Sequence, residues 1–333
     1  FTGDERTFDT WMDSSISPLF ITKYSKDNDF FLKTFPTQIR PQAKDIVRTW
    51  LYYTMLRCYQ LTGQLAWSDA WIMGYGVDEK GEKMSKSKGN VIDPFPIVHR
   101  YGADTFRFWS ASEANLGHDF RCSEQRILSS QKFLSKLWNL GRFLSSFDFI
   151  SEAPHELSAS DKWILAELSN LVEECKKGYE DFNFFIPANA IREFTWGLFA
   201  SHYVEMVKGR VYDINDSVGQ KSAIFTLHKC LSTILLLLAP ICPFITEELW
   251  TKVYTAKSIH LQHFPKSTQD YRELAKYTVL ITDFNSKVWN KKKVTVLEET
   301  GKPLSLKDPI RMSVPADLGL FKSDLQMMHN LSE

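Results

Sequence analysis

Lys83-Met84-Ser85-Lys86-Ser87 is the most informative stretch of this 333-residue chain, with Gly81 before it and Lys88-Gly89-Asn90 after it. Three lysines and two serines lie within six residues, between glycines. A flexible loop of this composition can bring several charged donors onto one polyphosphate and then release it. Lysine suits that task because its ammonium group is a mobile point charge on a long stem. The stretch therefore predicts a loop that binds phosphates and stabilises the negative charge of a leaving pyrophosphate.

The charge composition argues against a protein that is basic throughout. The chain has 40 lysine and arginine residues against 40 aspartate and glutamate residues, a formal net charge of +0. Local basic tracks for RNA are still compatible with this balance. The length permits two or three domains with a sizeable core.

The cysteines are scattered, odd in number and never in a C-x-x-C pair. They are Cys58, Cys122, Cys175, Cys230 and Cys242. We therefore expect a reduced, cytoplasmic protein without a cysteine zinc site. We expect no membrane association, because no signal peptide appears and the longest apolar run, from Ile234 to Pro240, is too short to span a bilayer. The chain opens with Phe1-Thr2-Gly3 rather than with methionine, which suggests the interior of a longer protein.

Two patterns predict an α/β region in the first part of the chain. An apolar, aromatic stretch starts at Trp67, ends in Gly74 and Gly76, and leads into the lysine loop. A strand followed by such a loop is typical of ligand sites at strand ends in α/β folds. The segment from Asp45 to Leu61 shows helical periodicity.

Long amphipathic helices are predicted from about Ser123 onward, because apolar residues recur at helical spacing. The stripes are formed by Ile127, Leu134, Leu137 and Phe143; by Ile164, Leu168, Leu171, Cys175 and Tyr179; by Ala190, Phe194, Leu198, Tyr203 and Val207; and by Leu227, Leu231, Ile234 and Leu238. Pro240 and Pro243 end the fourth helix, and a short fifth begins near Thr246. This pattern predicts an all-α bundle.

The tail from about Gln269 alternates more weakly. Lys291-Lys292-Lys293 precedes Val294-Thr295-Val296, which suggests an edge strand protected by its lysines. We therefore predict three parts. They are an α/β region over residues 1–122, a helical bundle over residues 123–265 and a small C-terminal appendage over residues 266–333. The predicted fold class is accordingly α/β plus all-α.

Five segments together resemble the class I aminoacyl-tRNA synthetases, whose second signature the lysine loop resembles. The other segments are Asp9-Thr10-Trp11-Met12-Asp13-Ser14-Ser15, Arg40-Pro41-Gln42-Ala43-Lys44-Asp45-Ile46-Val47-Arg48-Thr49-Trp50, Tyr101-Gly102-Ala103-Asp104-Thr105-Phe106-Arg107 and Ala239-Pro240-Ile241-Cys242-Pro243-Phe244-Ile245-Thr246-Glu247-Glu248-Leu249-Trp250. The segment from Arg40 is similar to an element of valyl-tRNA synthetases, especially archaeal-type ones. The resemblance covers residues 1 to about 265. It implies the second half of a Rossmann-type catalytic domain, followed by an antiparallel helical bundle that binds the anticodon region.

The resemblance also implies an ATP site. Lys83 and Lys86 would be the catalytic residues that hold the ATP phosphates and the departing pyrophosphate, with Lys86 the larger contributor. Asp45 would accept from the ribose hydroxyls, because a carboxylate can accept two hydrogen bonds at once. The implied ATP-binding residues are Ala43, Asp45, Lys83, Met84, Ser85, Lys86 and Ser87. Mg²⁺ would accompany ATP, and no protein ligand for this ion can be picked out in the sequence.

An amino-acid pocket is implied as well. Trp11 and Trp50 would form its walls, and Ile46 would close its floor. Isoleucyl enzymes resemble this stretch but carry a glutamine at the position of Ile46. A rigid apolar floor suits a small β-branched side chain such as that of valine. Such a pocket discriminates by only ~1–3 kcal/mol per methylene, so this family needs a separate editing domain.

Several features depart from the family pattern. Ala43 stands where the family has glycine, and its methyl group could crowd the nucleotide. Lys44 replaces the usual histidine and adds a cation. The first signature, H-I-G-H, is absent, since His260-Leu261-Gln262-His263 follows the lysine loop instead of preceding it and is interpreted as structural. The editing domain is also absent, so the resemblance is to a C-terminal part.

The resemblance implies ATP-dependent activation of valine and its transfer to tRNA by the parent protein. The bundle would bind valine tRNA through basic residues, with Lys176-Lys177 and the stretch from Lys208 to Arg210 as candidates. The isolated chain would bind ATP and tRNA but be inactive, and its missing N-terminal half would be a partner. Two alternatives stay open. One is a fragment of an isoleucyl-tRNA synthetase, and the other is a non-catalytic tRNA-binding module from a split or degenerate synthetase.

Overall fold

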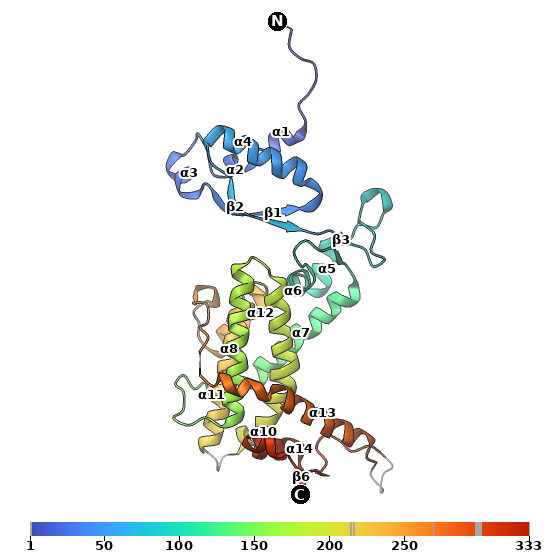
Figure 1. The fold of residues 1–333 in the computed structure, drawn as a ribbon, viewed down its shortest axis with the longest axis vertical. Helices are drawn as coiled ribbons and strands as arrows, with labels where there is room; N and C mark the ends of the chain where they lie inside the picture. Colours follow the sequence, from blue (N-terminus) through green and yellow to red (C-terminus); the bar gives the residue numbers. More distant parts are fainter. Residues whose placement is uncertain (1, 214, 216, 269, 297–301, 333) are drawn as a thin grey trace. The chain divides into compact units, whose positions relative to one another are not determined.

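The computed structural model describes residues 2–213, 215, 217–268, 270–296 and 302–332 (Figure 1). The chain divides into two compact units. Unit 1 comprises Phe1–Asp93 and Glu113–Ser123, and unit 2 comprises Pro94–Ser112 and Glu124–Glu333.

A two-stranded parallel sheet forms the centre of unit 1. Strand β1 (Thr37–Ala43) pairs along its length with strand β2 (Trp67–Met73). Parallel neighbours need a crossover, and here the crossover is helical. It runs through η1 (Lys44–Ile46), η2 (Val47–Leu51) and α4 (Tyr52–Thr62). The helix predicted over residues 45–61 and the strand predicted from Trp67 are therefore confirmed.

Short helices and a small hydrophobic core complete the centre of unit 1. The helices are α1 (Thr10–Ser14), α2 (Ser17–Ile21) and α3 (Asn28–Thr34). Asp9 caps α1 because its side chain accepts from the backbone N–H of Trp11, and Asp27 caps α3 in the same way. The core consists of Leu19, Phe35, Leu51, Cys58, Ala66 and Trp67. Unit 1 therefore buries few apolar side chains of its own.

Unit 2 is a helical bundle with one large core. Its helices are α5 (Pro94–Tyr101), α6 (Ala103–Glu113), α7 (Glu124–Leu144), α8 (Ala159–Glu180), α9 (Phe185–Arg192), η4 (Glu193–Tyr203), α10 (Val204–Tyr212), α11 (Ser217–Leu238), α12 (Pro243–Val253), η5 (Ile259–Leu261), η6 (Arg272–Tyr277), α13 (Thr278–Val294), η7 (Ala316–Phe321) and α14 (Lys322–His329). Helix α8 packs against α9 and α11, and α10 packs against α11 and α14 (Figure 1). Residues from each predicted stripe, such as Leu137, Ile164 and Leu231, are fully buried. The predicted bundle is therefore confirmed.

Helix α11 is the one helix in the described part of the chain that is long and apolar enough to cross a bilayer. The apolar run from Ile234 to Pro240 covers only the end of α11 and the turn after it. However, 67% of the apolar window of α11 is buried inside the structure. Its apolar residues, including Leu231 and Leu235, lie in the core of unit 2. Its composition is that of a central helix in a bundle.

Two segments that carry the family resemblance bind each other within unit 2. Asp104, in α6, accepts from the backbone N–H of Ile245 at 2.6 Å, in the first turn of α12. Nε of Arg107, one turn along α6, donates to the carbonyl of Ile241 at 2.7 Å. A carboxylate at a helix N-terminus is stabilised by the helix dipole and by the free N–H groups there. The segment from Tyr101 to Arg107 therefore fixes the start of α12.

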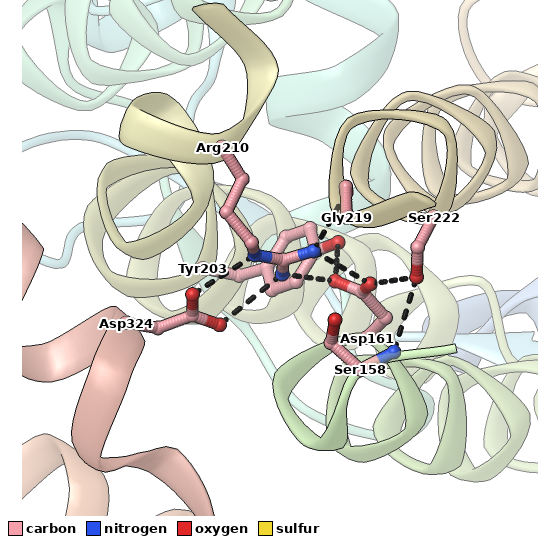
Figure 2. A network of polar contacts seen from close by, with 7 residues as sticks. All are labelled: Ser158, Asp161, Tyr203, Arg210, Gly219, Ser222 and Asp324. Atoms are coloured by element: carbon pink, nitrogen blue, oxygen red, sulfur yellow. Dashed lines mark hydrogen bonds and ion pairs between the residues drawn. The ribbon is translucent and has the colours of Figure 1, made fainter. Parts of the chain in front are cut away.

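The buried side chain of Arg210 joins several helices of the bundle (Figure 2). Nη1 and Nη2 of Arg210 donate to the carboxylate of Asp161 at 3.0 and 2.7 Å. Nε and Nη2 donate to Asp324 at 2.9 and 3.1 Å, and Nη1 also donates to the carbonyl of Gly219 at 3.0 Å. All five N–H groups of a guanidinium are thereby satisfied. Burial opposes the charge of Arg210, but hydrogen bonds and Coulombic attraction from Asp161 outweigh burial and raise its pKa.

Asp161 is fully buried and receives further donors. The hydroxyl of Tyr203 donates to it at 2.7 Å, and the hydroxyl of Ser222 donates to its other oxygen. Ser222 in turn accepts from the backbone N–H of Ser158 at 3.1 Å, just before α8 begins. The network therefore joins α8, η4, α10, α11 and α14.

The segment predicted as a lysine-protected edge strand is helical, so that prediction is wrong. Lys291-Lys292-Lys293 form the last turn of α13, and Lys292 is fully buried. Its ammonium group donates to the carbonyls of Leu306 and His329, each at 2.7 Å. Ile281, Phe284 and Val288, buried at helical spacing, explain the helix. Of the predicted strand, Val294 ends α13, and Val296 makes one isolated bridge with Pro303.

A second buried polar chain links α13 and α14 to η4. Nε2 of His329 donates to Oδ1 of Asn285 at 2.8 Å, and Nδ2 of Asn285 donates to Nδ1 of His202 at 2.9 Å. Burial lowers the pKa of both histidines, and that of His329 falls to about 4. Both imidazoles are therefore neutral around pH 7. Residues from 278–296 and 302–332 thus share the core and the polar networks of the bundle.

Acidification should destabilise unit 2 through His329. An unfolded histidine has a pKa of about 6.5, whereas that of folded His329 is about 4. Between these values the unfolded chain binds a proton that the folded chain does not. The stabilisation is thus complete above pH 6.5 and is lost as the pH falls towards 4, by about 1.4 kcal/mol per pH unit.

Urea unfolding followed by circular dichroism over this pH range checks the expectation. His329→Gln keeps an N–H donor for Asn285 but cannot titrate, so it should reduce the dependence of the unfolding free energy on pH, with His202 contributing the part that remains. His263→Gln, at an exposed histidine outside the network, should keep the wild-type slope. Equal slopes in the wild type and His329→Gln would contradict this account.

Candidate functional site

The lysine loop of unit 1 starts from a rigid turn. Val77, in β3 (Gly76–Val77), forms an antiparallel bridge with Lys83. Between them, Oδ1 of Asp78 accepts from the backbone N–H groups of Lys80 and Glu82 at 3.0 and 2.8 Å. The pKa of Asp78 is lowered, chiefly by the hydrogen bond from the Asn90 side chain. The turn therefore holds the start of the loop at the end of β3.

Asn90 fastens the other end of the loop. Its Oδ1 accepts from the backbone N–H of Ser85 at 2.9 Å, and its Nδ2 donates to Oδ2 of Asp78 at 2.9 Å and to the carbonyl of Lys83 at 3.4 Å. The sequence analysis quoted Asn90 but gave it no role. Its signal was its place at the end of Lys88-Gly89-Asn90, the stretch that follows the K-M-S-K-S string. An amide that both donates and accepts can close a loop in this way.

A single helical turn carries the second lysine of the loop. Ser85 caps η3 (Lys86–Lys88), because its hydroxyl accepts from the backbone N–H of Lys88 at 3.3 Å. Ser87 lies with its hydroxyl 3.2 Å from that of Ser85. Lys86 is exposed and forms no ion pair with any residue that the structure describes. Its ammonium group is therefore available to an anionic ligand.

The first lysine of the loop meets Asp45, the predicted ribose acceptor. Nζ of Lys83 lies 3.1 Å from Oδ2 of Asp45 and 4.0 Å from the centre of the Tyr75 ring. The hydrogen bond to Asp45 raises the pKa of Lys83. Both groups are partly exposed, so the ion pair is open to exchange with a ligand. The structure thus brings together Asp45, at the start of the crossover, and a lysine 38 residues later.

Tyr75 and Asp119 also belong to this cluster, and the sequence analysis missed both. Nζ of Lys44 lies 2.5 Å from Asp119 and 4.5 Å from the centre of the Tyr75 ring. Asp119 also accepts from the backbone N–H of Tyr75 at 2.7 Å, and the hydrogen bond from Lys44 lowers its pKa. Tyr75 is therefore a platform for two ammonium groups. No local sequence pattern indicates a role for Asp119, because its hydrogen-bond partners lie more than 40 residues away in the chain.

Two further members of the predicted ATP set lie nearby in unit 1. Met84 is half-buried, and its methyl group packs beside Gly76, 3.1 Å from where a Cβ there would lie. Ala43 is the last residue of β1, and its carbonyl accepts from Nε2 of Gln42 at 3.1 Å. The assignment of these residues to ATP stays a prediction.

The predicted amino-acid pocket is only partly assembled. Nε1 of Trp50 donates to the carbonyl of Ser14 at 3.1 Å, which ties η2 to α1, the helix that carries Trp11. Trp11 lines a cavity of about 330 Å³ whose other lining residues are Phe8, Asp9, Met12, Ser15, Tyr53, Leu56, Arg57 and Gln60. Ile46 and Trp50, both half-buried, are not among the residues lining it. The joint pocket of Trp11, Ile46 and Trp50 therefore stays a prediction.

The basic residues proposed for RNA contacts differ in accessibility. Lys176 and Lys177 are exposed on α8, and Lys208 pairs with Glu205. Arg210 is buried in the network described above, so its inclusion among exposed RNA contacts is wrong. Burial of a guanidinium with all its donors satisfied leaves none for a phosphate.

Two domain families match the chain. The family described as "tRNA synthetases class I (I, L, M and V)" matches residues 1–123. The family described as "Anticodon-binding domain of tRNA ligase" matches residues 161–302. The first match contains the lysine loop and Asp45, and the second contains most of the bundle.

Whole-chain comparisons give the same result. The chain is 42% identical over 334 aligned residues to a valine–tRNA ligase of Aeropyrum pernix, and 38% identical over 339 to one of Nanoarchaeum equitans. It spans 40% and 42% of the length of these relatives. Among solved structures, it resembles a leucyl-tRNA synthetase of Agrobacterium radiobacter in complex with tRNA (22% identity, TM-score 0.66), with 81% of this chain and 34% of the other covered. It also resembles a methionyl-tRNA synthetase of Mycobacterium tuberculosis in complex with methionyl-adenylate (20% identity, TM-score 0.62), with 78% and 53% covered.

The fold, the lysine loop and the two domain matches together define a member of the class I aminoacyl-tRNA synthetases. Within that class, the chain corresponds to the C-terminal part of archaeal valine–tRNA ligases. The resemblance predicted from the sequence is therefore confirmed.

Loss of the Asn90 side chain should free the lysine loop. Asn90→Ala removes an acceptor for Ser85 and a donor for Asp78, so the loop should open more often. Trypsin should then cleave after Lys83, Lys86 and Lys88 about 10-fold faster, as expected from the loss of about one net hydrogen bond. Limited proteolysis with mass spectrometry measures this rate.

Ser87→Ala is the matched control for that measurement. It removes only the contact between the hydroxyls of Ser87 and Ser85, and should leave the cleavage rate nearly unchanged. If Asn90→Ala were cleaved no faster than Ser87→Ala, Asn90 would not be the residue that closes the loop.

Proposed function

We propose that this chain is the C-terminal catalytic and tRNA-binding part of a valine–tRNA ligase. The parent protein activates valine with ATP and transfers it to valine tRNA. The contact between Asp45 and Lys83 carries the proposal, because it joins a ribose acceptor to a phosphate-binding loop in one cluster. The 42% identity to valine–tRNA ligases supports the choice of amino acid.

The first step is the attack of the valine carboxylate on the α-phosphate of ATP. A carboxylate oxygen of valine forms a new bond to the α-phosphorus. The bond from this phosphorus to the oxygen that bridges to the β-phosphate breaks, and pyrophosphate leaves. Ribose hydroxyls that donate to Asp45 would displace Lys83 from it and free its ammonium group for the phosphates. Lys86, exposed and without an ion pair in the described chain, adds a second charge. Donors aimed at charge that develops in the transition state are the main source of such rate gains.

The second step is the attack of the terminal ribose hydroxyl of tRNA on the carbonyl of valyl-adenylate. The ester forms, and AMP leaves with the electron pair of the broken bond. Positioning of the two substrates is the main requirement for this step. The helical bundle of unit 2 would help to position the tRNA by binding it away from its terminal ribose. This role agrees with the match of the bundle to anticodon-binding domains.

Magnesium would enter with ATP. The described residues contain no cluster of three or more His, Cys, Asp or Glu side chains suited to a metal ion. Mg²⁺ is usually held by substrate phosphates with only one or two carboxylates, so ATP itself would carry the ion, and no catalytic step is assigned to it.

Valine selection is proposed to rest on Trp11, Ile46 and Trp50. The isoleucyl alternative lacks support, because that branch carries a polar glutamine where this chain has Ile46. The non-catalytic alternative draws on Ala43, which departs from the glycine of the family at the end of β1. The cluster around Lys83, Asp45 and Tyr75 favours the catalytic function. A cytoplasmic location is part of the proposal, and the five cysteines, all free and buried, agree with it.

Binding of valine tRNA by the isolated chain should weaken steeply with salt. Neutralised phosphates release counterions, so log affinity falls with log salt by about 0.7–0.9 for each phosphate contacted. Fluorescence titration of labelled valine tRNA at two salt concentrations measures this slope. Lys177→Glu, at an exposed lysine of α8, should lower both affinity and slope.

A hairpin RNA of unrelated sequence is the control ligand, and Lys287→Glu on α13 is the control variant. Binding that does not depend on salt, or equal affinity for the hairpin, would remove the tRNA-binding role from unit 2.

A further inference from the structure

Two lysines of unit 1 hold their ammonium groups against the ring of Tyr75. Nζ of Lys83 lies 4.0 Å from the centre of this ring, and Nζ of Lys44 lies 4.5 Å from it. The face of an aromatic ring is negatively polarised and attracts a cation at such distances. The half-buried Tyr75 is thus a common neighbour of the first lysine of the loop and of a lysine at the start of the crossover.

The two lysines are neutralised by different kinds of partner. Lys44 is paired with Asp119, with 2.5 Å between Nζ and Oδ1. Lys83 is paired with Asp45 at 3.1 Å, and Asp45 is the proposed acceptor for the ribose hydroxyls of ATP. A ribose bound at Asp45 would displace Lys83 and leave the pair of Lys44 and Asp119 intact. The contact with the Tyr75 ring would still hold Lys83 at the site after this exchange.

Asp119 has two effects on this arrangement. Two ammonium groups on one ring would repel each other if both were unneutralised, and the carboxylate of Asp119 balances the charge of Lys44. The same oxygen, Oδ1, accepts from the backbone N–H of Tyr75 at 2.7 Å. Asp119 therefore fixes the backbone that carries the ring and removes the charge that would oppose Lys83.

The segment that carries Asp119 lies along the strand that carries Tyr75. Backbone hydrogen bonds of 2.8 to 3.1 Å join the two segments, from Gly117 to Ile72, from Phe120 to Tyr75 and from Cys122 to Val77. Their close approach requires glycine at position 74, because a Cβ there would lie 2.0 Å from the carbonyl oxygen of His118. Backbone contacts therefore set the position of Tyr75 before any ligand binds.

We infer that Tyr75 and Asp119 are positioning residues that hold the ammonium group of Lys83 in place for the phosphates of ATP. The inference rests on the proposed function and adds two residues that act through Lys83. A lysine released from its carboxylate is a flexible, strongly hydrated side chain, and immobilising it opposes the reaction. Contact with a ring reduces this loss and leaves the N–H groups free to donate to phosphate oxygens.

Acetylation of the isolated chain tests the contact without any catalysis. Trace acetic anhydride is the reagent, and mass spectrometry gives the rate for each lysine between about pH 7 and pH 11. Tyr75→Leu removes the ring, so the ammonium form of Lys83 loses stabilisation, and Lys83 should react about 3-fold faster. Tyr75→Phe keeps the ring and should react at a rate close to that of the wild type. Lys86 is the internal control and should react equally in all three chains.

The kinetic test uses a chimera, in which this chain replaces the matching C-terminal part of the Aeropyrum pernix valine–tRNA ligase. In valine-dependent ATP–pyrophosphate exchange, Tyr75→Leu should lower kcat about 10-fold, because contact with a ring is stronger where ATP excludes water. The KM for valine should change by less than about twofold, since Lys83 acts on charge that develops in the transition state. Tyr75→Phe should again be close to the wild type, because the ring and not its hydroxyl holds the lysine.

Double-mutant cycles in the chimera show whether both residues act through Lys83. In a Lys83→Ala background, Tyr75→Leu should have little further effect on kcat. Asp119→Ala should lower kcat about 5-fold by itself and far less once Tyr75→Leu is present. Asp119→Asn keeps an acceptor for the backbone of Tyr75 but leaves Lys44 unneutralised, so its kcat should lie between those of the wild type and Asp119→Ala.

Two results would overturn the inference. One is a Lys83 that is acetylated at the wild-type rate in the isolated Tyr75→Leu chain. If that variant does not fold, a wild-type rate in Asp119→Asn has the same meaning. The other is an equal loss of kcat by Tyr75→Leu with and without Lys83, because Tyr75 would then contact the substrate itself.

Failure of the proposed function gives a different result. The chimera would then show no exchange with valine, while Lys83 of the isolated Tyr75→Leu chain would still be acetylated faster than in the wild type. That combination would refute the valine–tRNA ligase assignment and leave Tyr75 as the residue that holds Lys83.

Discussion

The buried guanidinium of Arg210 is the interaction on which unit 2 depends. It donates to Asp161 from α8 and to Asp324 from α14, and both carboxylates are almost fully buried. Three buried charges are tolerated only when every donor and most acceptors are paired, and removing one partner of such a group typically costs about 3–5 kcal/mol. The network therefore allows one arrangement of the helices it joins (Figure 2). Through Asp324 it also ties α14 to the core of the bundle.

Unit 1 also contains a buried arginine, which stacks on Trp50 and Trp67. Arg40, like Arg210, is less than one-tenth exposed, but its acceptors are absent from the described chain. The residues proposed for catalysis, Lys83, Lys86 and Asp45, are all in unit 1. The small core and two-stranded sheet of unit 1 can hold the lysine loop in place, since its own turns and Asn90 do so locally.

Local patterns in the sequence predicted much of this structure. Helical periodicity predicted the bundle because each stripe of apolar residues needs only a neighbouring stripe to bury it. The lysine loop was predicted from its composition, and Asp45 from family resemblance. Tyr75 and Asp119 were missed because their roles depend on contacts with Lys44 and Lys83 that only the fold creates. The edge strand predicted from Lys291-Lys292-Lys293 was wrong, because lysines are equally suited to an edge strand and to the last turn of a helix.

The central claim is that this chain supplies the phosphate-binding loop and the valine-selective residues of a synthetase whose remaining half lies elsewhere. Valine-dependent ATP–pyrophosphate exchange tests it most directly, with the isolated chain compared with the Aeropyrum pernix chimera. We expect no exchange by the isolated chain, and exchange by the chimera that is faster with valine than with isoleucine. A folded chimera that fails to exchange, or that prefers isoleucine, would contradict the account.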